Sequence, residues 1–173
     1  MAELSFREKN ILVELLKNCK VSDREMASKL RTSQPTVTRL RNKLWQKGFV
    51  SSFTVIPSLS KIGLGLMMFT FFRRIQENVR KDFKDWIKKN PEIVFSSEGE
   101  GLREDTLVIV SVHPQFDAAE HFLNDIRTRF GEKLGGMSSF FTPVRSTIKE
   151  FNLANVVEYH ITHAPSESSK KKS

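Results

Sequence analysis

The sequence predicts an α+β protein with a helical first third and a β-α-β-β-α-β remainder. Apolar residues recur at helical spacing in three short segments before residue 48, and later apolar segments alternate between strand-like and helix-like periods. The charge divides the chain at a similar place. Residues 1–63 hold 12 Lys or Arg against 5 Asp or Glu, and the whole 173-residue chain carries +8. This asymmetry indicates two modules, the first of which suits a polyanionic partner.

Three serines stand where N-caps would begin helices in the first third. The first two are followed three residues later by glutamate, as in a capping box. These serines are Ser5, Ser22 and Ser33. The first predicts a helix over 6–18, the second a short helix, and the third a helix with Pro35 in its first turn. Gly48 ends the third helix as a left-handed cap.

The segment after Gly48 completes a recognisable layout. Residues 49–56 are rich in β-branched and aromatic side chains, which predicts a strand or a small hairpin closed by Pro57. The order of helix, short helix, tight turn, helix and strand is that of a winged helix-turn-helix. In this motif the third helix enters the major groove of DNA.

The outward face of the third helix carries groups that can bind DNA. Val37, Leu40 and Leu44 form its inward stripe, and no acid lies between Ser33 and Lys47. Arginine can bind guanine, asparagine or glutamine can bind adenine, and hydroxyl groups and helix-start amides can hold phosphates. An ordinary solvated helix face is the alternative. The predicted DNA-binding residues are Ser33, Gln34, Pro35, Thr36, Thr38, Arg39, Arg41, Asn42, Lys43, Ser51 and Ser52.

The remainder of the chain predicts a ferredoxin-like domain. Strands are expected at 64–73, 93–97, 106–113 and 137–149, and helices at 77–90 and 116–130. Residues 151–161 add a strand or a short helix. The expected domains are a winged helix-turn-helix over 1–57, a linker over 58–65, a ferredoxin-like dimerisation and effector domain over 66–163, and a disordered basic tail over 164–173.

Helices on one side of a four-stranded sheet leave its other face to be covered. The apolar residues offered for the two strand faces are Phe69, Phe71, Phe140 and Phe141. We therefore expect a homodimer that forms through the sheet. A two-fold dimer places two recognition helices over a palindromic DNA site.

The segment from Ser33 to Leu40, SQPTVTRL, resembles the recognition helix of bacterial and archaeal winged-helix transcription regulators. Its local sequence is most similar to the MarR type. The order of modules is similar to the leucine-responsive regulator (Lrp/AsnC) family. That resemblance implies a homodimer or higher oligomer with an amino-acid effector bound near the turn after the second strand. The candidate effector residues there are Gly99, Gly101 and Asp105, and a charged hairpin turn is the alternative. Trp45 either packs under the wing with Phe49 and Phe53, which we favour, or reaches DNA.

Other site classes lack support in the sequence. Cys19 is the single cysteine, and His160 and His163 form the only close histidine pair, so neither a metal site nor a catalytic residue is predicted. No phosphate-binding glycine motif or nucleophile motif occurs, and no cofactor is expected. The longest apolar stretch is too short to span a bilayer, and no signal peptide precedes it.

The predicted function is that of a cytoplasmic, prokaryotic-type transcriptional regulator rather than an enzyme. Its expected partners are double-stranded DNA and a second copy of the chain, with a small-molecule effector as a further expectation and no membrane. An adaptor that binds proteins, or nucleic acid without regard to sequence, is the first alternative. The second is an enzyme whose site lies in the ferredoxin-like domain.

Overall fold

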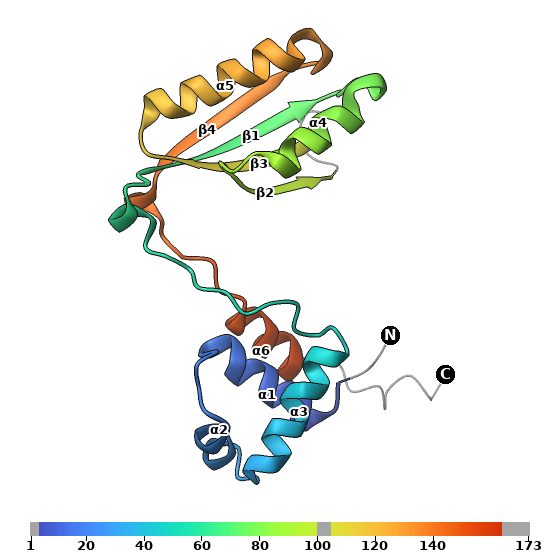
Figure 1. Ribbon diagram of the computed structural model, residues 1–173, viewed down its shortest axis with the longest axis vertical. Coiled ribbons are helices and arrows are strands. Elements are labelled where there is room, and N and C mark those ends of the chain that lie inside the picture. Colours follow the sequence, from blue (N-terminus) through green and yellow to red (C-terminus); the bar gives the residue numbers. More distant parts are fainter. Residues whose placement is uncertain (1–3, 100–104, 164–173) are drawn as a thin grey trace. The chain divides into compact units, whose positions relative to one another are not determined.

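The computed structural model describes residues 4–99 and 105–163 (Figure 1). It divides into two compact units. We call residues 1–55 together with 150–173 the helical unit, and residues 56–149 the sheet unit, within the described part of each. None of the described helices is both long enough and apolar enough to span a membrane.

The three helices expected in the helical unit are all present. They are α1 (Phe6–Lys17), α2 (Asp23–Lys29) and α3 (Gln34–Gln46). Each of the three predicted serines accepts a hydrogen bond at the start of its helix, and the first forms a complete capping box with Glu8. Gly48 has φ +72°, which confirms the left-handed cap. The core consists of Ile11, Leu15, Val21, Met26, Ala27, Val37, Leu40 and Leu44.

The strand predicted for residues 49–56 is absent, and this prediction is wrong. The structure gives residues 50–58 no regular secondary structure. Instead the backbone N–H groups of Phe49 and Val50 both donate to the carbonyl of Leu44, at 3.0 and 3.4 Å. Phe53 then stacks on Trp45 with ring centroids 5.5 Å apart, which confirms that Trp45 packs under this segment. The stacked rings and the hydrogen bonds at the end of α3 thus hold this segment in place. No strand among the described residues pairs with it.

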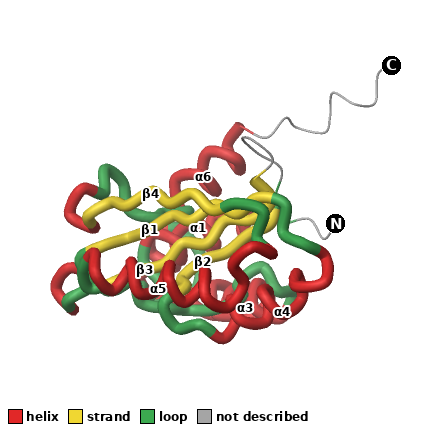
Figure 2. Tube along the Cα trace, turned by 90° about the horizontal axis from the view of Figure 1, so that it is seen from above, coloured by secondary structure: helices red, strands yellow, loops and turns green. Residues whose placement is uncertain are grey.

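The sheet unit confirms the β-α-β-β-α-β order. Its elements are β1 (Leu66–Arg73), α4 (Glu77–Lys89), β2 (Ile93–Glu98), β3 (Asp105–His113), α5 (Phe116–Phe130) and β4 (Met137–Pro143). The strands form one antiparallel sheet in the order β2-β3-β1-β4. Both helices lie on the same side of it (Figure 2). The last strand ends before residue 149, because Pro143 lacks an amide donor and a 3₁₀ turn over Val144–Ser146 follows.

Alternation along β1 separates the two faces of the sheet. Met68 and Phe72 are fully buried under the helices, together with Ile109 of β3. Phe141 also belongs to this side, where its ring lies 4.9 Å from that of Phe116. The four phenylalanines therefore lie on both faces, as predicted, with Phe141 under the helices and Phe69, Phe71 and Phe140 on the open face.

The open face carries an apolar row that crosses all four strands. The paired residues of this row, from β2 to β4, are Phe95, Val110, Phe69 and Phe140. Phe95 is 56% exposed and Phe140 is 60% exposed. We call these four residues the apolar row. No helix of the sheet unit covers it within the residues described.

The last helix, α6 (Ala154–His163), differs from the expected domain assignment. We expected residues 66–163 to form one domain, but α6 belongs to the helical unit and packs on α1. An ion pair of 2.8 Å joins Lys17 Nζ to Glu158 Oε1 across these two helices. The correction has a physical reason, since α1 supplies an apolar surface for a helix too short to fold alone.

Candidate nucleic-acid interface

The start of α3 is fixed by local chemistry. The Ser33 hydroxyl accepts a hydrogen bond from the Thr36 N–H at 3.4 Å and lies 2.8 Å from the Thr36 hydroxyl. Pro35 occupies the first turn, where its missing N–H is not needed. Val37 and Leu44 are fully buried on the inner side. These contacts orient the helix so that its polar face points outward.

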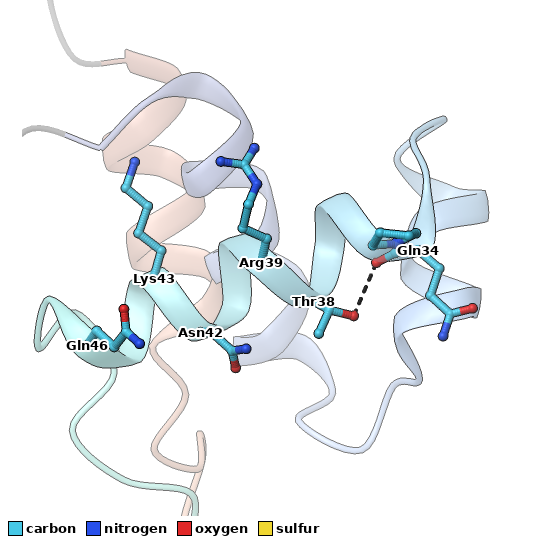
Figure 3. Close-up of a pocket in the computed structure, with 7 residues that line it drawn as sticks. Gln34, Thr38, Arg39, Asn42, Lys43 and Gln46 are labelled. Carbon is cyan, nitrogen blue, oxygen red and sulfur yellow. Dashed lines mark hydrogen bonds between the residues drawn. The ribbon is translucent and has the colours of Figure 1, made fainter.

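A hollow of about 860 Å³ lies along this outward face. It brings together six of the predicted DNA-binding residues and adds Gln46, which helical geometry also places outward. The seven lining residues are Gln34, Pro35, Thr38, Arg39, Asn42, Lys43 and Gln46. Figure 3 shows Arg39 and Lys43 extending to one side of the helix, with Asn42 and Gln46 on the other. Hydrogen-bonding and cationic groups thus share one face over the length of α3.

Arg41 lies outside this hollow and binds within the helical unit. Its guanidinium donates to the carbonyl of Val21 at 3.2 Å and forms an ion pair with Asp23. The Thr38 hydroxyl donates to the same carboxylate and also to the Gln34 carbonyl, at 3.2 Å for the latter (Figure 3). Burial by itself would raise the pKa of Asp23, but the bonds from Thr38 and Arg41 outweigh it and lower that pKa. Arg41 and Thr38 therefore hold α2 against α3.

Lys43 is likewise tied to another helix. Its ammonium lies 2.8 Å from Glu8 Oε1, and the Glu8 side chain is only 2% exposed. The other carboxylate oxygen of Glu8 accepts from the N–H and the hydroxyl of Ser5, at 2.8 and 2.6 Å. The bonds from Lys43 and then Ser5 lower the pKa of Glu8 to about 2. This capping carboxylate thus joins α1 to α3.

Arg39 is distinct among the cationic side chains of α3. Within residues 4–99 and 105–163, no carboxylate forms an ion pair with it, whereas Arg41 and Lys43 each have one. The sequence could not show this difference, because Asp23 and Glu8 come from other helices. Arg39, Asn42 and Gln46 remain as outward groups with two or more polar atoms each.

The remaining predicted site residues lie elsewhere. Ser51 and Ser52 are exposed in the irregular segment after α3. In the sheet unit, Gly99 is exposed just after β2, and Asp105 begins β3 opposite Arg73. Gly101 lies outside the described residues. The effector site at these three positions therefore stays a prediction.

Comparison with known proteins identifies the type of the N-terminal module. Residues 7–51 match the model of a family described as winged helix-turn-helix DNA-binding. A search of curated proteins gave no match.

Solved structures resemble nearly the whole chain. A transcriptional regulator from Neisseria meningitidis in complex with L-methionine has a TM-score of 0.77 at 21% identity, covering 89% of this chain and 99% of that one. An AsnC family transcriptional regulator from Agrobacterium tumefaciens gives 0.76 at 18%, covering 88% and 99%. LrpC of B. subtilis gives 0.71 at 22%, covering 87% and 100%.

These likenesses establish architecture. The helix caps, the core of the helical unit and the family match agree on the N-terminal module, and the similar structures cover 87% to 89% of this chain. This chain therefore has the fold of the Lrp/AsnC regulators, in which a winged helix-turn-helix DNA-binding module is joined to a ferredoxin-like α+β domain.

Proposed function

We propose that this protein is a sequence-specific, DNA-binding transcriptional regulator that acts as a homodimer. The observation that carries the proposal is the outward face of α3. Arg39, Asn42 and Gln46 lie on this face, and α3 itself contains no carboxylate. A helix of this kind, in the third position of a helix-turn-helix, is the element that reads base edges.

Each group on this face has a distinct role in the proposal. Arg39 makes a paired contact with a guanine, and Asn42 makes one with an adenine. The N–H groups at the start of α3 hold a phosphate, and the hydroxyls of Ser51 and Ser52 hold others. Lys43 and Arg41 serve to orient α3, because each is already bonded to a carboxylate of the helical unit.

The apolar row supports the homodimer. Four aligned apolar side chains across an open sheet face are unusual in a monomer, because such a surface in water is unfavourable. A second copy presents the same row about a two-fold axis and covers it. The resulting dimer carries two α3 helices, which matches a palindromic site with half-sites about 34–36 Å apart or a multiple of that distance.

An effector and a compartment complete the proposal. One structurally similar regulator was solved with L-methionine, so a small molecule such as an amino acid is a reasonable effector class. We place it near Gly99, Gly101 and Asp105, as the resemblance implies. The protein would act on DNA in the cytoplasm and catalyse no reaction.

Selection from random duplex DNA tests this function. We expect a palindrome that binds at least about 10³-fold more tightly than random sequence. Arg39→Ala and Asn42→Ala should each weaken binding to the selected site by about 1–3 kcal/mol and relax the preference for one base pair. Arg129→Ala in the sheet unit is the matched control.

Two results would contradict the proposal. An unchanged base preference in both α3 variants would exclude α3 as the reading element. Enrichment of no motif, with an affinity that collapses as salt rises, would mean attraction to phosphates alone. The non-specific nucleic-acid adaptor would then be the better description.

A further inference from the structure

The C-terminal helix α6 belongs to the DNA-binding module in space, although it follows the sheet unit in sequence. It begins where the Asn152 side chain accepts a hydrogen bond from the Ala154 N–H at 2.8 Å. It packs on α1, as Figure 1 shows, and Glu158 pairs with Lys17 at 2.8 Å. The pairing with Glu158 raises the pKa of Lys17.

The contact with α6 gives α1 a second buried face. Ile11 and Leu15 point into the core of the helical unit. Val13 is 7% exposed but lies on the opposite side of the helix and is not part of that core. Lys17 follows it by one turn on the same side, toward α6. Ala154, which is 2% exposed, is buried at the start of α6. Val13 and Ala154 are thus both buried without belonging to the core of the helical unit.

The path of the chain makes this arrangement informative. Residues 56–149 form the sheet unit, so both ends of that unit continue into the helical unit. The first connection leads from α3 and is held by the stack of Phe53 on Trp45. The second leads into α6 and thus to α1. Because Glu8 of α1 is paired with Lys43, both connections end on helices that position the recognition face.

We infer that α6 is a second tether through which the sheet unit fixes the orientation of α3 in the dimer. This inference rests on the proposed function. A winged-helix module on one flexible connection can rotate and accept half-sites at several spacings, since a flexible link sets only an effective concentration. Two connections that are both anchored on packed helices restrict that rotation. The tether therefore makes binding selective for one half-site spacing.

The variant Ala154→Glu tests this inference by placing a charge at a buried position, which should release α6 from α1. Asn155→Glu puts the same charge at the neighbouring exposed position and is the matched control. Binding is measured by fluorescence anisotropy with the full chain on three duplexes. These carry one half-site, two half-sites at the selected spacing, and two half-sites with about 5 bp inserted, a half turn.

For the parent and Asn155→Glu, we expect the insertion to lower the affinity by about 10²-fold, because the second half-site is lost. For Ala154→Glu we expect binding to the single half-site within about 3-fold of the parent. The affinity that this variant loses on insertion should shrink to about 5-fold or less, since the freed DNA-binding modules can rotate to meet both half-sites. A role in stability alone would change all three affinities together.

A charge reversal provides a second, milder test in case Ala154→Glu unfolds the module. Lys17→Glu and Glu158→Lys should each reduce the spacing selectivity, and the double variant should restore it. Hydrogen exchange of α6 amides reports in each case whether the helix has opened. Unchanged selectivity in a variant whose α6 has opened would overturn the tether, as would failure of the double variant to restore a lost selectivity. Unchanged selectivity and exchange throughout the reversal series, with Ala154→Glu unfolded, would also overturn it. A parent that binds no half-site duplex would instead refute the proposed function.

Discussion

Replacing Glu8 by glutamine removes one charge while keeping the helix start intact. Glutamine at this position can still accept a hydrogen bond from the Ser5 N–H, as in other capping boxes. The change therefore removes the charge that pairs with Lys43, 2.8 Å away, and that strengthens the bonds from Ser5. Because Glu8 is buried between α1 and α3, its ionisation is linked to the folding of the helical unit.

The magnitude follows from the pKa of Glu8, which is lowered from 4.5 to about 2 in the folded chain. Each pKa unit corresponds to about 1.4 kcal/mol, so the full linkage would be about 3–4 kcal/mol. Lys43 is 41% exposed, and water screens part of this interaction. We expect about 1–3 kcal/mol. A lowered folded-state pKa gives stability that is complete above pH 4.5 and is lost as the pH falls toward 2.

Urea denaturation followed by Trp45 fluorescence measures this effect, in a Trp86→Phe background so that only the helical unit reports. We expect the free energy of unfolding of the parent to exceed that of Glu8→Gln at pH 6, and this difference to shrink steadily as the pH falls from 4.5 toward 2. Other carboxylates titrate in both proteins and cancel in the difference. Glu14→Gln on the same helix is the control. Parallel pH profiles for parent and Glu8→Gln would refute the reasoning.

Three further predictions concern packing. Phe140→Asp should leave the fold intact but convert the dimer to a monomer in sedimentation, because it puts a charge into the apolar row; a dimer that persists would contradict the sheet interface. Trp45→Ala should expose residues 50–53 to proteolysis and cost about 0.5–1.5 kcal/mol beyond the lost buried area, measured by thermal unfolding; unchanged cleavage would argue against the stack. Gly135→Ala would bring a Cβ to 2.9 Å from Arg74 Cβ and should lower the free energy of unfolding by about 1–3 kcal/mol. The control Gly99→Ala meets no atom within 4 Å and should not lower it. Equal melting temperatures of the two variants would show that the turn can adjust.

Local patterns predicted the regular elements well. The bounds of α5 agree with the predicted 116–130, and α1 ends one residue before the predicted 18. Capping serines, an ending glycine and apolar spacing act within a few residues, so they can be read from the sequence directly. The order β-α-β-β-α-β along the chain also follows from local information, because each element is indicated by its own residues.

The failures share a different cause, since each depends on a partner that is distant in sequence. The wing was predicted as a strand from its composition, but Phe53 stacks on Trp45 instead. Residues 151–161 were assigned to the sheet unit, because nothing in them indicates that α1, some 140 residues earlier, offers a place to pack. Val13 was the available signal, as an apolar residue on the side of α1 that faces away from the core.

The candidate interface shows the same division between local and distant information. Helical geometry identified the outward face of α3, and the acid-free run suggested that all its cations could meet DNA. Three-dimensional contacts separate those cations, because Asp23 binds Arg41 and Glu8 binds Lys43. A face that relies on Arg39 and amide side chains gains less from phosphate attraction than its formal charge implies. Base contacts, and the orientation that α1 and α6 impose on α3, then carry a larger share of the selectivity.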